Sequence, residues 1–249
     1  MCYHFADADT QEYIDWYVKK NGLKVYIWQG AKYYVNGFDH GKNIVACQGK
    51  DHLSELEWGL VPHWAADSAK AKDIRVKTLN AKAETIFELP SFRKAIIRQK
   101  CLIFAKGFFE WRHIDTKTKI PYLIGVRDDS TGDTFRPFTF GGIYDTWVDK
   151  DSGELKETFS IITVPANEMM EVIHNSKKRM PLIISETDHF AWLNTEFPDR
   201  IKQLMAPYPS KFMIAHPISK RITQRGVDKN CPEILQGEEY PQVEFSEFL

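Results

Sequence analysis

The second residue of the chain, Cys2, carries two groups that could do chemistry. Removal of Met1 ahead of so small a side chain would leave a free α-amine beside the thiol. Such a 1,2-aminothiol condenses with an aldehyde and closes into a five-membered thiazolidine ring. The α-amine has an ordinary pKa of about 7.7 to 8.0 and the thiol one of about 8.5, so both are within reach near neutral pH. Position alone favours a plainer alternative, a functionless cysteine on a frayed terminus.

Three more side chains are of types suited to catalysis. Glu110 lies in the aromatic run 107–112, where burial would raise its pKa towards neutrality and suit a general acid or base, although an ion pair with an arginine explains it equally well. His174 ends a predicted helix, where a histidine can titrate near pH 7, but a satisfied polar contact is its plainer role. Asn80 precedes an Ala/Glu run, for which helix capping is the simpler interpretation.

The composition describes an ordinary soluble globular protein. Its 249 residues, 43% hydrophobic and 27% charged, suffice for a sizeable core. Without an apolar run of about 18 to 20 residues or signal-peptide features, we expect a cytoplasmic protein that does not enter membranes. The cysteines form no CxxC pair, which predicts reduced thiols (Cys2, Cys47, Cys101 and Cys231). No P-loop, GxGxxG or metal-ligand spacing occurs, and we expect no cofactor.

The charge balance is nearly neutral, with a net charge of −1. Any nucleic-acid contact must therefore depend on local basic patches, each of which is more often merely a solvated face. The candidate patches are Lys70, Lys72, Arg75 and Lys77, then Arg93, Lys94, Arg98 and Lys100, then Lys177, Lys178 and Arg179. Two tryptophans, Trp58 and Trp64, are either core residues, the commoner fate, or stacking platforms for an unpaired base.

Periodicity and turn residues predict the elements that must position these side chains. Helices are predicted at 10–20, after residue 80 or 90 with a basic face over 91–99, and at 167–173, 188–193 and 200–205. Strands are predicted at 24–28, 43–47, 55–62, 101–105, 107–112, 121–126, 138–143, 158–164, 180–184 and 211–217, with loops at 33–42 and 65–77. We expect an α+β fold, a single domain over residues 1–235 built on a large, mainly antiparallel, barrel-like β-sheet flanked by short helices, and a polar C-terminal tail over residues 236–249.

Five blocks of sequence together resemble the SRAP (SOS response-associated peptidase) family of abasic-site processing proteins. In the family's order they are Cys2 at the mature N-terminus, Trp-Gly-Leu-Val-Pro at 58–62, Asn-Ala-Lys-Ala-Glu-Thr at 80–85, Gly-Phe-Phe-Glu-Trp at 107–111, and Ile173-His174 followed by Arg179-Met180-Pro181. The likeness extends from residue 2 to about residue 233. Five blocks in register are far more specific than any one of them.

The resemblance implies that Cys2 traps the ring-opened aldehyde of an abasic site in single-stranded DNA as a stable thiazolidine cross-link, with some lyase activity through the Schiff base. It implies that three side chains surround the cysteine: His174 as the acid that assists opening of the sugar ring, Glu110 as a proton shuttle, and Asn80 as the group that orients substrate or amine. The implied DNA contacts are phosphate binding by Lys82 and Arg93 and base stacking by Trp58 or Trp64. Arg98 and Arg179 are further expected DNA-binding residues. We expect a monomer that is nucleoid-associated when bound to DNA.

The chain departs from the family pattern in three places. Tyr3-His4-Phe5 stands where Gly-Arg-Phe is usual, which removes an arginine that could bind phosphate and adds a bulky ring. Lys82 replaces an arginine, keeping the charge but losing the bidentate fork. The loop 33–41 lacks the usual Asn-x-Ala-Pro pattern, so contacts made by that loop cannot be transferred.

Two other functions are compatible with the same residues. The family name records a thiol autopeptidase that removes its own leading residue, and Cys2 with His174 and Glu110 could form its catalytic set. The other is a non-catalytic single-strand-binding or chromatin-reading module in which Cys2 is incidental.

Overall fold

The computed structural model describes residues 2–24, 32–128, 130, 132 and 134–248. The strand predicted at 24–28 lies almost entirely outside these residues. Among the described residues, no helix is long and apolar enough to cross a membrane.

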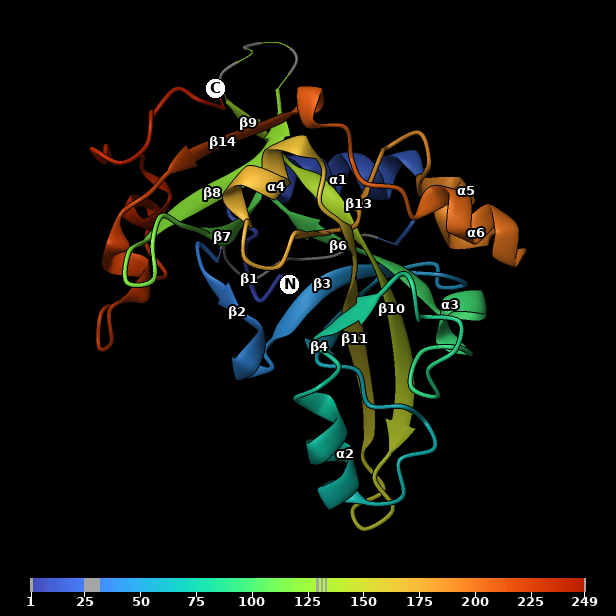
Figure 1. Ribbon diagram of the computed structural model, residues 1–249. Helices are drawn as coiled ribbons and strands as arrows, with labels where there is room; N and C mark the ends of the chain where they lie inside the picture. Colours follow the sequence, from blue (N-terminus) through green and yellow to red (C-terminus); the bar gives the residue numbers. More distant parts are fainter. Residues whose placement is uncertain (1, 25–31, 129, 131, 133, 249) are drawn as a thin grey trace.

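Two β-sheets form the centre of a single-domain α+β fold (Figure 1). The first has the order β14-β8-β7-β1-β2, with β9 paired to β8, and the second has the order β12-β11-β4-β3-β6-β10-β13, with β5 paired to β11. The strands are β1 His4–Ala6, β2 Val35–Asn36, β3 Lys42–Cys47, β4 Leu53–Trp58, β5 Asn80–Lys82, β6 Lys100–Ala105, β7 Gly107–His113, β8 Lys119–Arg127, β9 Phe135–Arg136, β10 Phe138–Val148, β11 Leu155–Pro165, β12 Arg179–Pro181, β13 Ile183–Ile184 and β14 Met213–Pro217.

The second sheet closes on itself, because β10 pairs with β11 as well as with β6. Strands β11, β4, β3, β6 and β10 thereby form a barrel. Most pairings are antiparallel, as predicted, but β11 runs parallel to both β4 and β5. Closure leaves these strands without a free edge, and their inward side chains fill the interior.

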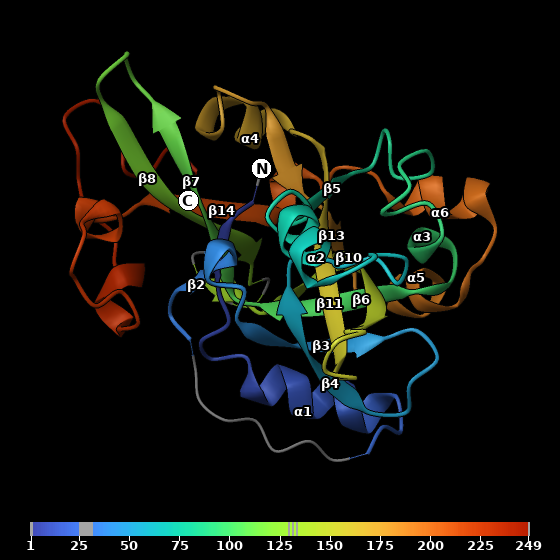
Figure 2. The same ribbon diagram turned by 90° about the horizontal axis from the view of Figure 1, so that it is seen from below.

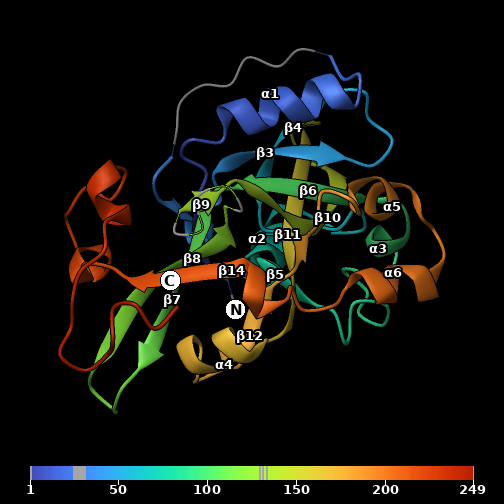
Figure 3. The ribbon, with the colours of Figure 1, turned by 90° about the horizontal axis from the view of Figure 1, so that it is seen from above.

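Short helices cover the outside of the sheets, as Figures 1, 2 and 3 show from three directions. They are α1 Gln11–Lys20, α2 Ser68–Arg75, α3 Ala95–Arg98, α4 Glu168–Ile173, α5 His189–Asn194 and α6 Pro198–Leu204, with 3-10 turns η1 Gly37–Asp39, η2 Ser210–Phe212, η3 Lys220–Thr223 and η4 Pro232–Leu235. The apolar stripe of α1 faces the barrel, where Tyr17 packs edge-on against Phe104 of β6 with ring centroids 5.2 Å apart.

Three predictions about residues 65–99 were wrong. The segment 65–77 is not a loop throughout, because Asp67 caps α2 by accepting from the amide of Lys70, and this helix buries Ala71 and Ile74. No helix follows Asn80 directly, since that residue begins the parallel strand β5. The basic helix expected over 91–99 is only the short α3, preceded by turns.

The segment from residue 218 onward, which includes the tail predicted over residues 236–249, packs back onto the first sheet. Ile218, Ile222 and Ile234 are buried, and Glu247 forms an ion pair with Arg112 of β7. The loop predicted at 33–42 is likewise interrupted by β2 and η1. Because apolar residues are sparse in these segments and follow no clear period, the sequence does not predict these contacts.

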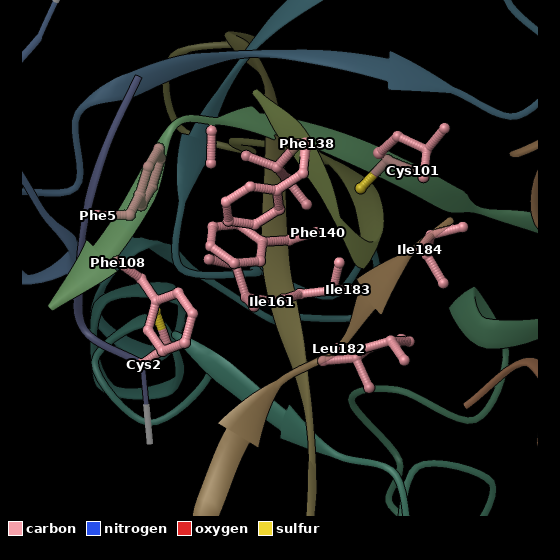
Figure 4. Packing of buried hydrophobic residues seen from close by; sticks show 14 of the residues in the cluster. Cys2, Phe5, Cys101, Phe108, Phe138, Phe140, Ile161, Leu182, Ile183 and Ile184 are labelled. Carbon is pink, nitrogen blue, oxygen red and sulfur yellow. The ribbon is translucent and has the colours of Figure 1, made fainter. Parts of the chain in front are cut away.

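An aromatic core fills the space where the two sheets meet. Phe140 of the barrel contacts both Phe5 of β1, at 5.7 Å between ring centroids, and Phe108 of β7, at 6.0 Å. Figure 4 shows Cys2 at the end of this cluster, beside Phe108. The N-terminal segment is thus anchored in the core rather than frayed, since Cys2 and Phe5 are fully buried.

Candidate active site

The chain directly after Cys2 is held by strand pairing. Strand β1 lies between β2 and β7, and its Phe5 pairs with Phe108 of the antiparallel β7. Because the strands are antiparallel, the residues before Phe5 on β1 lie opposite the residues after Phe108 on β7. Glu110 is the second of these residues on β7. The register therefore brings Cys2 and Glu110 together even though they are distant in sequence.

Asn80 holds Cys2 from the other side. Its Nδ2 donates a hydrogen bond of 2.8 Å to the carbonyl oxygen of Cys2, and its strand β5 is fixed by parallel pairing with Ile161–Thr163 of β11. The Oδ1 of the same amide is buried and has no hydrogen-bond partner among the described residues. A buried acceptor of this kind is costly unless something donates to it, so it is an open position next to Cys2.

Glu110 and His174 form a buried pair in the same place. Their Oε1 and Nδ1 atoms lie 3.6 Å apart, and Nδ1 lies 2.7 Å from the carbonyl oxygen of Arg179. A carbonyl can only accept, so Nδ1 carries the proton, and in the neutral ring Nε2 is the acceptor. The position of His174 follows from α4. Asn167 caps the N-terminus of this helix by accepting from the amide of Met170, and His174 caps its C-terminus.

Burial sets the protonation states of this group. It raises the pKa of Glu110 to about 7 and lowers that of His174 to about 4, with the positive charges of His113 and Lys177 acting in the same direction. Burial, and secondly the negative charge of Glu110, raise the pKa of the Cys2 thiol far above its ordinary range. At neutral pH, Cys2 is therefore a thiol, His174 is neutral, and Glu110 is divided between its two forms.

A pocket of about 410 Å³ opens over this pair. Its volume lies in the range usual for small-molecule sites. Glu110 and His174 form part of its wall, and the remaining lining residues are Tyr3, His4, Phe109, Trp111, His113, Lys119, Ser176 and Lys177. Buried acid–base groups are thus accessible from an open, partly aromatic and partly cationic cavity.

The residues expected to contact DNA have different surroundings. Lys82 is exposed on the same face of β5 as Asn80, two residues further on, and Arg93 is also exposed. Trp64 is 43% exposed, and its Nε1 donates to the carbonyl of Pro90 at 3.2 Å. Arg98, the last residue of α3, pairs with Glu196 just before α6. Figures 1 and 2 show α3 and α6 on the other side of the ribbon from β7, the strand that carries Glu110.

Two of the expected DNA contacts have structural roles instead. Trp58 is fully buried, donates from Nε1 to the carbonyl of Leu79 at 2.8 Å and stacks on Phe159. It cannot receive a base, so the stacking role predicted for it was wrong. The guanidinium of Arg179 is bonded to both carboxylate oxygens of Glu84 and to Thr163, which leaves little of it for a phosphate.

Sequence reasoning missed His113 and Lys119 as pocket residues and placed Lys177 only in a basic patch. His113 and Lys119 come together because they pair in the hairpin of β7 and β8. Lys177 is brought there by Asn175, which bonds the backbone of His113. The signal was the hairpin itself, but its register could not be read without knowing where the turn begins.

Known proteins resemble this chain in sequence and in fold. The chain is 37% identical over 195 residues to "abasic site processing protein YoqW" of Bacillus subtilis (strain 168), covering 78% of this chain and 80% of that protein. It is 30% identical over 198 residues to "abasic site processing protein HMCES" of Gallus gallus, covering 74% of this chain and 56% of that protein. A crystal structure of a protein from Bacteroides thetaiotaomicron matches with a TM-score of 0.84 at 34% identity, covering 96% of this chain and all of that one.

The relatives thus form a class of proteins named for processing abasic sites. A family model described as SOS response associated peptidase (SRAP) matches residues 1–225. The chain belongs to this SRAP family.

Proposed function

We propose that this protein processes abasic sites in single-stranded DNA and captures them covalently through Cys2 once Met1 has been removed. The observation that carries the proposal is the convergence on Cys2 of Asn80, which bonds its carbonyl oxygen, and of the buried Glu110–His174 pair. The names of relatives at 37% and 30% identity support the class of substrate.

The reaction requires both nucleophiles of the mature Cys2. The α-amine attacks the aldehyde carbon of the ring-opened abasic sugar, and loss of water gives an imine. The Cys2 sulfur then adds to the imine carbon, and the thiol proton is transferred to the nitrogen. One aldehyde and one aminothiol thereby become one thiazolidine and one water.

Glu110 suits the proton transfers of this sequence. With its pKa raised to about 7 by burial, its protonated form can donate to the departing hydroxyl and its carboxylate can take a proton back. We expected His174 to be the acid that opens the sugar ring. Because its pKa is lowered to about 4, chiefly by burial, the neutral ring is better suited to accept the proton of the sugar hydroxyl at Nε2 while Glu110 donates to the ring oxygen.

The order of events follows from the state of the thiol. Its pKa lies well above the usual range because Cys2 is buried and near Glu110, so the amine acts first and the sulfur only closes the ring. A thiol peptidase needs the opposite, a thiolate stabilised by a cation or a paired imidazolium. The surroundings of Cys2 therefore favour aldehyde capture over peptide cleavage. While the imine persists, it acidifies the adjacent sugar carbon, so β-elimination competes with ring closure.

A denaturing gel tests the proposal. Mature protein is incubated with an oligonucleotide that contains one abasic site, beside Cys2→Ala and a variant with one glutamate inserted between Met1 and Cys2. The insertion keeps the thiol but leaves the cysteine nitrogen in a peptide bond, and we expect a shifted band only for the wild type. An absent wild-type band, or an equal band for Cys2→Ala, would refute covalent capture. Peptide cleavage that depends on Cys2 would support the peptidase instead.

A further inference from the structure

The hairpin of β7 and β8 brings two basic side chains together at the pocket. His113 is the last residue of β7 and pairs directly with Lys119, the first residue of β8. Side chains of such a cross-strand pair lie on one face about 4.5 to 5.5 Å apart at Cβ. Their closeness also affects titration, because the charge of Lys119 adds to burial in lowering the pKa of His113.

A clamp attaches a third basic residue to this hairpin. The Nδ2 of Asn175 donates to the carbonyl of His113 at 2.8 Å, and its Oδ1 accepts from the backbone amide of His113 at 3.1 Å. The turn that follows His174 is closed by the amides of Lys177 and Lys178, which both donate to the His174 carbonyl. Lys177 is therefore carried to the end of the hairpin, where Figures 1 and 2 show α4 beside β7 and β8.

The two lysines at the end of the hairpin, Lys119 and Lys177, have no carboxylate partner among the described residues. Within the part of the chain that the structure describes, neither Lys119 nor Lys177 forms an ion pair, whereas the adjacent Lys178 approaches Glu171 to 4.0 Å. Both line the same pocket as Glu110 and His174. His4 lines it too but stays neutral, since burial lowers its pKa to about 4. The positive charge of the pocket at neutral pH thus comes from Lys119 and Lys177.

These lysines lie across Cys2 from Lys82. Cys2 is bonded to Asn80 on β5, the strand that also carries Lys82, while the chain after Cys2 pairs with β7. A DNA strand with its abasic sugar at Cys2 would extend towards β5 in one direction and towards the β7–β8 hairpin in the other.

We propose that Lys119 and Lys177 together bind one of the two phosphates that flank the abasic sugar. The ligand is a phosphodiester, because two mobile ammonium groups at the rim of an open pocket suit a compact, solvated anion. The assignment rests on the proposed function, because that function makes the bound ligand a strand of DNA. Asn175 positions the pair by holding the turn of Lys177 against the hairpin.

Binding without chemistry tests the assignment. The probe is a single-stranded oligonucleotide with one tetrahydrofuran abasic analogue, which has no aldehyde, and its affinity is measured by fluorescence anisotropy at several salt concentrations. We expect Lys119→Ala and Lys177→Ala to weaken binding by about fivefold or less each. The double variant should reduce the slope of log affinity against log salt by about 0.7, the value for one phosphate on a single strand. The matched controls, Lys117→Ala in the same hairpin turn and Lys178→Ala in the same loop, should bind like wild type.

Neutral linkages locate the phosphate. A methylphosphonate is placed on the 3′ or the 5′ side of the analogue, and each oligonucleotide is tested with wild type and with the Lys119→Ala/Lys177→Ala double variant. At one of the two linkages only, the methylphosphonate should lower the affinity of wild type. The same substitution should leave the affinity of the double variant unchanged, because its phosphate contact is already lost. Equal losses in both proteins at both linkages, or losses as large in the two control variants, overturn the assignment. Failure of the proposed function has a different result, since the analogue would bind normally while a true abasic site gave no cross-link.

Discussion

The amide of Asn80 holds the carbonyl group of Cys2 at a hydrogen-bond distance of 2.8 Å, although 78 positions separate the two residues. Rotation about the bonds of Cys2 is thereby restricted, which fixes the direction in which its nitrogen points. The second atom of the same amide, Oδ1, is left as an acceptor for a proton on that nitrogen or on the substrate.

Replacing this amide should slow capture more than it weakens binding. For Asn80→Ala we expect a cross-linking rate at saturating DNA that is lower by about 10- to 100-fold, because the amine loses its orientation. Asn43→Ala is a matched control, since Asn43, like Asn80, donates to a backbone carbonyl and has a buried Oδ1 that is unpartnered within the described structure. Equal rates for the two variants in a single-turnover assay would show that Asn80 acts only through stability.

Glu110 should make the fold less stable as the pH rises. Its pKa is about 7 in the folded protein because of burial, against an ordinary 4.5. Between these values the folded state keeps a proton that the unfolded chain releases, so the free energy of unfolding falls as pH increases through this window. The full penalty above pH 7 is about 3 kcal/mol. Urea unfolding of Glu110→Gln should match wild type near pH 4.5 and exceed its stability by up to that amount at pH 8. A pH-independent difference would contradict the assigned shift.

His174 should have the opposite effect on stability. Its pKa is lowered by burial to about 4 from 6.5, so the unfolded chain binds the extra proton and stability is lost as pH falls through that interval. His174→Gln should flatten this acid limb and slow cross-linking by about 100-fold. His189→Gln is its control, because burial also lowers the pKa of His189 to about 4 while its Nε2 contacts Thr139. That variant should flatten the limb but cross-link normally.

The two tryptophans should separate binding from folding. Trp64→Ala removes an exposed ring, and we expect single-strand affinity to fall by at least about fivefold with little change in the melting temperature. Trp58→Phe removes the bond to the buried Leu79 carbonyl, so the free energy of unfolding should fall by about 1 to 3 kcal/mol with DNA affinity unchanged. The reverse pattern in paired thermal melts and anisotropy titrations would exchange their roles.

Local patterns predicted the elements whose signals are local. The helix expected at 10–20 is α1, Gln11–Lys20, because apolar residues recur on one face and Thr10 precedes it. The segment 65–77 was missed because α2 buries only two small or medium side chains, Ala71 and Ile74. Whether Trp58 or Trp64 faces the core depends on what covers each face of β4 and the following turn, which no spacing in the sequence reveals.

The candidate site divides in the same way. Chemical type made Cys2, Glu110 and His174 candidates beside plainer alternatives, and the resemblance placed them at one site; the structure brings them together. Asn80 was expected at the site by resemblance, but its strand could not be foreseen, since β5 depends on parallel pairing with β11, about eighty positions later. His113 and Lys119 required a hairpin register, and the engagement of Arg179 by Glu84 required two distant segments to meet.

The complete burial of Cys2 has a kinetic consequence. Water and small nucleophiles reach its sulfur only when β1 separates from β7 and Cys2 separates from Asn80. The lifetime of any adduct on Cys2 is then governed by the frequency of this local opening as well as by the intrinsic hydrolysis of the bond. We therefore expect protection of the β1 amides from hydrogen exchange to increase together with adduct lifetime.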